Sequence, residues 1–219
     1  MAQQAGAGQA AAAAPAASGA PKRRQARGER RMAELLEAAG QVFAASGYSA
    51  TTTNAIAARA GVSPGTLYQY FSNKDAIADA LAEYYTDRLQ QVIDDVLGAG
   101  VTGLPLEELL DRVLDPLVAF YLRNPSCTVL FMGPDSPQRL TDHHLPLHAA
   151  MLSRVAGLLA VLAPELPADQ LARSAEVVVY LFKGVLPLIL AAAPEDRPGY
   201  TVELKRAFVG YFGLLRAPN

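Results

Sequence analysis

The sequence predicts an all-α protein of two domains, and three observations lead to this fold class. Apolar residues recur at three- and four-residue spacing in successive segments, which is the period of a helix with one buried face. No segment shows the strict alternation of apolar and polar residues that is typical of a half-buried strand. Proline and glycine stand between the periodic segments, where they begin or end helices. With 219 residues, of which 51% are apolar, the chain can bury a sizeable core.

The chain divides into three expected parts. Residues 1–27 are rich in Ala, Gly, Gln and Pro and then in bases, with no large apolar side chain after Met1, so we expect a disordered basic arm. Residues 28–75 are expected to form a domain of short helices, and residues 76–219 a larger helical domain. Residues 1–75 hold eight basic and four acidic side chains, whereas the remainder is acidic. A basic N-terminal part followed by an acidic remainder favours a polyanionic partner for the N-terminal part alone.

The first two helices of the smaller domain are predicted from periodicity and capping residues. Apolar residues from Met32 onward mark one face of a helix, which Gly47 ends. The hydroxyls of residues 51–53 can cap a short second helix, and Gly61 closes it.

A third helix is predicted after Ser63, whose hydroxyl can cap it. Pro64 takes the first helical position, where a missing amide proton has no cost. This helix is expected to run to about Phe71, and Asn73 begins a fourth and longer helix through Leu97. Five further helices are predicted in the larger domain, at residues 106–122, 127–132, 140–162, 167–192 and 200–215.

The second and third helices, joined by residues 60–63, match a helix-turn-helix, in which the second short helix enters the major groove of DNA. Its face toward the core is expected to carry Pro64, Leu67 and Phe71, and its opposite face Gly65, Thr66, Gln69 and Tyr70. A glutamine amide can pair with adenine, while Tyr68 and Lys74 beside this face suit phosphate oxygens. On spacing alone, a helical hairpin with a solvated polar face is an alternative interpretation.

Residues 31–82, about a quarter of the chain, resemble the DNA-binding domain of the TetR family of bacterial transcriptional repressors. The resemblance is carried by the run AARAGVSPGTLYQYFSNKD at residues 57–75. The matching positions are Gly47, Thr52, Ile56, residues 60–63, residues 65–68, Phe71 and Lys74. The match is specific, and the rest of the chain is similar to the family in length and helix order.

The resemblance implies roles for individual residues of the helix-turn-helix. Contacts to the DNA backbone are implied for Thr52, Thr53, Ser63, Tyr68 and Lys74. Base reading is implied for Gly65, Thr66, Gln69 and Tyr70, with Asn54 as a further candidate. Family members differ at Pro64 and Gln69, so the resemblance does not imply an operator sequence. The basic arm either adds a DNA contact or serves as a solubilising tail.

The resemblance also implies that the larger domain holds a pocket for a small-molecule effector and that its last two long helices form a homodimer interface. Candidate pocket residues are Tyr121, Phe131, His148, Tyr180 and Lys183. Aromatic residues at helical spacing are, however, more often plain core. Residues 177–182 are apolar all round a helix, which requires burial on several sides. Candidate interface residues are Val178, Phe182, Phe208, Tyr211, Phe212 and Leu215.

Several other functions are disfavoured. His144 and His148 are spaced as metal ligands on a helix, but Pro146 between them and the lack of further ligands argue against a metal site. The single cysteine, Cys127, is typical of a cytoplasmic protein and is expected to be a buried small residue rather than a redox sensor. The apolar stretch at residues 177–193 is shorter than the roughly 20 residues that span a bilayer, so no membrane association is expected.

The predicted function is therefore a ligand-responsive repressor that binds palindromic operator DNA as a homodimer and is released by a small, lipophilic effector. No phosphate-binding loop, nucleophile elbow or carboxylate-histidine motif indicates an enzyme, and no cofactor is expected. An architectural DNA-binding protein without a ligand is the alternative.

Overall fold

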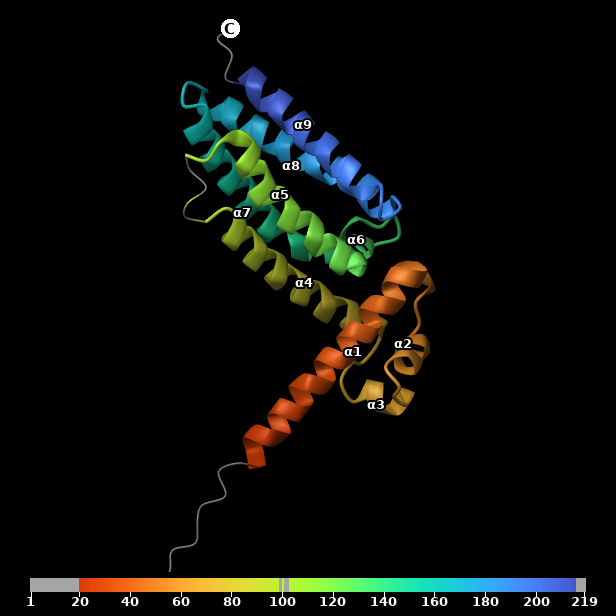
Figure 1. The fold of residues 1–219 in the computed structure, drawn as a ribbon. Helices are drawn as coiled ribbons and strands as arrows, with labels where there is room; N and C mark the ends of the chain where they lie inside the picture. Colours follow the sequence, from red (N-terminus) through yellow and green to blue (C-terminus); the bar gives the residue numbers. More distant parts are fainter. Residues whose placement is uncertain (1–19, 99, 101–102, 216–219) are drawn as a thin grey trace, which may run out of the picture.

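The computed structural model describes residues 20–98, 100 and 103–215, except for the side chains of residues 20–25, 141 and 143. Within these ranges the chain forms helices joined by short connections and contains no strand, which confirms the predicted all-α class. The helices are α1 (Ala20–Ala50), α2 (Thr53–Arg59), α3 (Pro64–Tyr68), α4 (Lys74–Val96), α5 (Leu106–Arg123), α6 (Pro125–Met132), α7 (Gln138–Leu162), α8 (Ala168–Ala191) and α9 (Arg197–Leu215). Figure 1 shows the short helices α2 and α3 at one end and a bundle of long helices at the other.

The first helix is longer than the sequence predicts. Residues 20–27 were expected in a disordered arm, yet α1 includes them and projects beyond the rest of the molecule (Figure 1). This segment consists largely of Ala, Lys, Arg and Gln, which are good helix formers, and just after it Glu34 pairs with Arg30 and Arg31 one turn away. The remainder of the expected arm, residues 1–19, lies outside the described residues. Gly47 breaks the helical path of α1 with a φ of +76°, a conformation that only glycine adopts without strain.

Three side-chain caps fix the starts of α2, α3 and α4. Thr52, Ser63 and Asn73 each accept a hydrogen bond from the backbone amide three residues ahead, as the sequence predicts. The apolar residues behind these caps form one fully buried core, which includes Leu35, Phe43, Ile56, Leu67 and Ile77. The helix-turn-helix therefore folds as a compact unit against α1 and α4.

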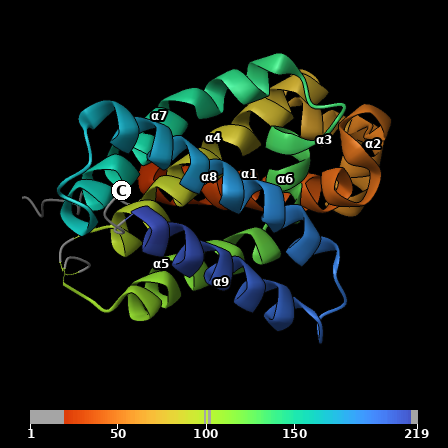
Figure 2. The ribbon, with the colours of Figure 1, turned by 90° about the horizontal axis from the view of Figure 1, so that it is seen from above.

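The larger domain is a bundle in which α5, α7, α8 and α9 enclose a second apolar core. Its buried residues include Leu110, Leu159, Ile189, Leu204 and Phe208. Helix α4 packs against both domains and so connects them. Viewed from above, α8 and α9 lie side by side along one face of the bundle (Figure 2).

By length and composition alone, α7 and α8 could each cross a membrane. In this fold both helices belong to the bundle, because α7 buries Leu140, Leu147 and Leu159 and α8 buries Leu186 and Ile189. Core helices of globular proteins often meet the same length and composition criteria.

Candidate nucleic-acid interface and regulatory cavity

Helix α3 presents a small polar surface whose hydroxyls are mutually oriented. Ser63 caps the helix by accepting from the amide of Thr66 at 3.1 Å, and the two hydroxyls lie 2.9 Å apart. Gly65 is exposed between them, and a side chain there would meet no other part of the molecule closer than the Ser63 hydroxyl at 3.8 Å. The start of α3 is thus free to approach a DNA backbone closely.

The beginning of α2 lies beside this surface. The hydroxyls of Thr53 and Tyr68 are 3.1 Å apart, which joins α2 to the end of α3. Thr52 and Asn54 are exposed, and Tyr68 is 51% exposed. We refer to these side chains, together with Ser63, Thr66 and Gln69 of the neighbouring segment, as the polar strip of α2 and α3.

The C-terminal end of α3 differs from the sequence-based prediction. The α-helix ends at Tyr68, with Gln69 as its C-cap, rather than at Phe71. Gln69 remains exposed on the polar side, but Tyr70 is half-buried and packs against the core on the α1 side. Pro64 is exposed instead of facing the core. Of the expected inward residues, Leu67 and Phe71 are buried.

Lys74, which was expected to contact the DNA backbone, binds groups of the protein itself. Its ammonium donates to the carbonyl oxygens of Tyr48 and Ser49 at 2.9 and 3.2 Å and lies 4.5 Å above the Tyr48 ring. Lys74 therefore holds the turn between α1 and α2 in place. Any phosphate contact that it makes is added to this structural role.

A polar junction connects α1 and α4, which flank the helix-turn-helix, to the start of α7. The guanidinium of Arg139 donates to Asp79 at 2.9 Å and to the Tyr48 hydroxyl at 3.0 Å, and lies 3.2 Å from Asp75. The Tyr48 hydroxyl also donates to Asp75, and this hydrogen bond is the main reason why the pKa of Asp75 is lowered. Nearby, the amide of Ser49 donates to Asp135 at 2.8 Å.

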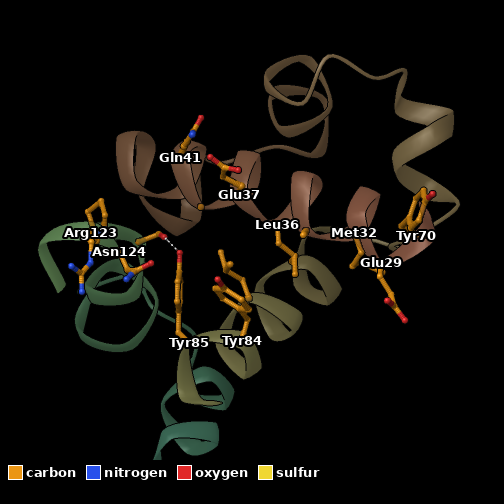
Figure 3. Close-up of a pocket in the computed structure, with 16 residues that line it drawn as sticks. Glu29, Met32, Leu36, Glu37, Gln41, Tyr70, Tyr84, Tyr85, Arg123 and Asn124 are labelled. Carbon is orange, nitrogen blue, oxygen red and sulfur yellow. Dashed lines mark hydrogen bonds between the residues drawn. The ribbon is translucent and has the colours of Figure 1, made fainter. Parts of the chain in front are cut away.

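A cleft of about 760 Å³ lies between α1, α4 and the junction of α5 and α6. In Figure 3, Tyr84 and Tyr85 of α4 lie below Leu36 of α1, and Tyr70 lies at the end of the cleft opposite Arg123 and Asn124. Tyr85 shares a hydrogen bond of 2.5 Å with Ser126 at the start of α6 (Figure 3). Gly40 allows this close approach, because a Cβ there would lie 3.0 Å from the Tyr85 hydroxyl.

An apolar cavity of about 80 Å³ lies inside the larger domain, with walls from α4, α5, α7, α8 and α9. Leu114, Leu159, Val179 and Phe208 are among its lining residues. A second space of about 20 Å³ adjoins it. The two spaces share the lining residues Ile93, Leu117, Met151 and Phe182. The two spaces are therefore neighbours in the domain core.

The smaller space ends at polar groups. Tyr121 from α5, His144 from α7 and Lys183 from α8 line it. Burial, with a smaller contribution from the ammonium of Lys183, lowers the pKa of His144 to about 4. Burial also lowers the pKa of Lys183 and raises that of Tyr121. His144 is therefore neutral near pH 7.

The five candidate pocket residues are placed differently from one another. Tyr121 and Lys183 line the smaller space, as expected. Phe131 lies behind it, stacked on the His144 ring with centroids 4.6 Å apart. Tyr180 is 61% exposed, and the His148 ring contacts it edge-on at 6.0 Å, so this pair lies outside the cavity lining.

The candidate interface residues need correction. Phe208 and Phe212 are only 2% and 7% exposed, and with Val178 and Phe182 they line the apolar cavity of their own chain. Tyr211 and Leu215 are half-buried against the same core. A three- and four-residue stripe identifies a buried face, but it cannot distinguish the core of one chain from a subunit contact. The outer face of α8 and α9 instead exposes Val177, Tyr180, Leu188, Val202 and Leu214.

Arg139 and Asp135 were not singled out by sequence analysis. Their partners are 60 and 86 residues away in sequence, so no local spacing connects them. His144 was considered only for metal binding. Among the side chains that the structure describes, no three His, Cys, Asp or Glu residues are grouped to hold a metal ion. Cys127 is fully buried, and burial raises the pKa of its thiol, which keeps it protonated.

Two family models match the chain on the two domains seen in the structure. Residues 35–81 match "Bacterial regulatory proteins, tetR family", and residues 105–212 match "Tetracyclin repressor-like, C-terminal domain". Together these two ranges cover more than half of the chain.

Curated relatives are similar mainly in the first part of the chain. The transcriptional regulator YhgD of Bacillus subtilis is 33% identical over 86 residues, which are 39% of this chain and 44% of the relative. The transcriptional repressor KstR2 of Mycobacterium tuberculosis is 39% identical over 79 residues, 36% of this chain and 38% of the relative. The matches thus span less than half the length of these two relatives.

Solved structures share the fold over most of their length. A TetR-like transcriptional regulator from Rhodococcus sp. RHA1 superposes with a TM-score of 0.64 at 21% identity, covering 82% of this chain and 96% of that one. A second regulator from Rhodococcus sp. gives 0.65 at 20% identity, covering 86% and 100%. The solved structures show that the fold is shared, and the family models on both domains show that the chain belongs to the TetR family of bacterial regulatory proteins.

Proposed function

We propose that this regulator is a ligand-responsive repressor that binds a palindromic operator as a homodimer and leaves it when a lipophilic small molecule enters the larger domain. The observation that carries the proposal is the position of α7. The second residue of this helix, Arg139, contacts Tyr48 of α1 and Asp75 of α4, which flank the helix-turn-helix, and the helix continues along the wall of the internal cavity. One helix thus reaches both regions.

Operator binding is assigned to the polar strip of α2 and α3. Gln69 is exposed and its amide can pair with an adenine edge, whereas Thr53, Ser63 and Tyr68 supply hydroxyls for phosphate oxygens. The exposed Arg27 of α1 adds positive charge to the same N-terminal part of the chain. Repression rather than activation is supported by the relative KstR2, which is named as a repressor.

A homodimer is supported by the apolar outer face of α8 and α9. Val177, Leu188 and Leu214 are 47%, 55% and 77% exposed, an unfavourable arrangement for large apolar side chains that remain in water. Pairing of this face with its copy about a twofold axis buries these residues and presents two α3 helices to a palindrome.

Release is explained by a shift between two positions of the helix-turn-helix. A ligand in the cavity must displace side chains of α7, such as Met151, because the preformed space is small. A movement of α7 is transmitted by Arg139 to Tyr48 and Asp75. Effector and operator then oppose each other by one reciprocal coupling free energy.

The proposal is tested by footprinting on the DNA upstream of the protein's own gene. We expect a protected palindrome with half-sites about one helical turn or a multiple of it apart. We also expect lipophilic compounds that raise the melting temperature to weaken this protection. Uniform protection without sequence preference and without any ligand effect would instead indicate an architectural DNA-binding protein. Such a regulator acts in the cytoplasm, where its DNA lies.

A further inference from the structure

We propose that the effector is an anionic amphiphile, whose hydrocarbon part fills the apolar cavity and whose carboxylate binds between Lys183, His144 and Tyr121. The inference rests on the proposed function, because it assigns a ligand class to the same cavity. Two independent features lead to it: a lining that suits only hydrocarbon, and polar groups without partners at one end.

The larger space accepts only apolar groups. Every side chain that lines it is Leu, Ile, Val, Met or Phe. A ligand hydroxyl or amide placed there would lose its hydrogen bonds to water without replacement, at a cost of several kcal/mol. An alkyl chain loses nothing by entering, and Met151 and Phe182 can adjust around it because their side chains rotate.

Lys183 is a half-buried cation without an anionic partner in the described part of the chain. The contact that the structure gives its ammonium is the face of the Tyr180 ring at 5.6 Å. Other lysines with buried stems are paired differently: Lys205 lies 2.7 Å from Asp111 and contacts Asp115. A buried charge is usually paired, so an anion bound at Lys183 would remove an unfavourable feature of the free protein.

His144 supplies a second unpaired group at the same place. It is 8% exposed, and its Nδ1 is buried without a hydrogen-bond partner. Most buried polar atoms in proteins are paired, so such an atom beside a cavity indicates a missing partner. The stacked Phe131 ring holds the imidazole in position, and the carboxylate can accept a hydrogen bond from it.

The charges around this site favour an anion over other head groups. Lys183 and the two imidazoles of His144 and His148 lie close enough that the ammonium lowers the pKa of both. The carboxylate of Glu176 also acts at this site, where it raises the pKa of His148. A cationic head group would meet the Lys183 charge, and a neutral one would leave it unpaired.

Isothermal calorimetry with three probes of equal chain length tests the inference on the full-length protein. The probes are octanoate, 1-octanol and octylammonium. We expect octanoate to bind at least about tenfold more tightly than 1-octanol, and octylammonium to bind least. Lys183→Met, which keeps the length of the side chain, should remove the preference for octanoate while leaving 1-octanol binding within about twofold. Lys183→Arg should retain the preference.

The outcomes separate this inference from the proposed function. Equal binding of octanoate and 1-octanol by the wild type, or an unchanged preference in Lys183→Met, would refute the carboxylate site and leave a lipophilic effector in place. Failure of all three probes to bind would refute the amphiphile. Operator binding is measured on the same preparations without probes, so a regulator that binds no operator contradicts the proposed function whatever the calorimetry shows.

Discussion

The guanidinium of Arg139 lies 3.2 Å from the carboxylate of Asp75, and this pair joins the helical bundle to α4 just after the helix-turn-helix. The two side chains come from α7 and from the first turn of α4, and Tyr48 at the end of α1 contacts both. The helices α1, α4 and α7, which are not consecutive in the chain, are thereby held together at one point. Their relative position sets where α3 stands with respect to the bundle.

The first prediction concerns Arg139→Gln. The side chain is 38% exposed, so its loss should lower the free energy of unfolding by only about 1 kcal/mol or less. The response should change more than the stability: a ligand that weakens operator binding in the wild type should do so less in the variant, because α7 no longer holds Tyr48. Urea unfolding and operator titrations with and without ligand measure the two effects.

Arg173→Gln is the matched control for Arg139→Gln. Arg173 pairs with Asp169 on the outside of α8, where both side chains are about two-thirds exposed, at 67% and 68%. Arg173→Gln should change neither the free energy of unfolding nor the effect of ligand on operator binding. An undiminished ligand response in Arg139→Gln would show that the junction does not transmit the signal.

The sequence predicts the local structure well because local signals determine it. Thr52, Ser63 and Asn73 act as caps within four residues of the groups that they bind, and Gly47 breaks α1 where its φ is positive. The all-α class and the helix order follow from periodicity. The start of α1 was missed because low apolar content was interpreted as disorder, although Ala and Arg favour a helix without any core.

The site is predicted only where sequence neighbours form it. Ser63 was predicted to cap α3, and it does so on the amide of Thr66 three residues ahead, whereas Arg139 contacts Tyr48 across 91 residues. The stripe that includes Phe212 was assigned to a subunit contact, but its residues form the core of their own chain. Periodicity shows that a face is buried and does not show what covers it.

The second prediction contrasts Gln69 with Lys74. Gln69→Ala should leave the melting temperature unchanged, because the side chain is exposed, and should relax the preference at one base pair by about 1 to 3 kcal/mol. Lys74→Ala should weaken binding to all sequences and also lower the melting temperature, because it removes two hydrogen bonds to the last turn of α1. Competition binding on single-base operator variants, together with thermal melts, separates the two effects.

If Gln69→Ala weakened all operator variants equally, Gln69 would not be a base reader. If Lys74→Ala melted like the wild type, its contacts to Tyr48 and Ser49 would not contribute to the fold.

The third prediction is a dependence of stability on pH that originates at His144. Its pKa is lowered to about 4 in the folded protein by burial and by Lys183, whereas an unfolded histidine titrates near 6.5. The unfolded chain therefore binds more protons between these values, so the stabilising contribution is complete above pH 6.5 and is lost as the pH falls toward 4. Between about pH 7.5 and about pH 5 the expected loss is about 2 kcal/mol.

Urea unfolding of the wild type and of His144→Gln at these two pH values tests this dependence. The variant should show a smaller loss, and the remainder should come mainly from His148, whose pKa is lowered in the same direction. An equal loss in both proteins would mean that His144 is not the group that titrates.

The last prediction concerns the outer face of α8 and α9. Leu188 is 55% exposed on this face, so Leu188→Arg should cost little in a single chain but should place a charge in the apolar centre of a dimer. Sedimentation velocity should show a dimer for the wild type and a monomer for the variant, with operator affinity lost although Leu188 lies far along the chain from α3.

Val161→Arg is the control, because Val161 is 56% exposed on α7 and should tolerate the charge. Phe212→Arg should instead unfold the bundle, since that ring is buried in its own chain. A wild-type protein that sediments as a monomer at micromolar concentration, or a dimer that survives Leu188→Arg, would contradict the placement of the interface on this face.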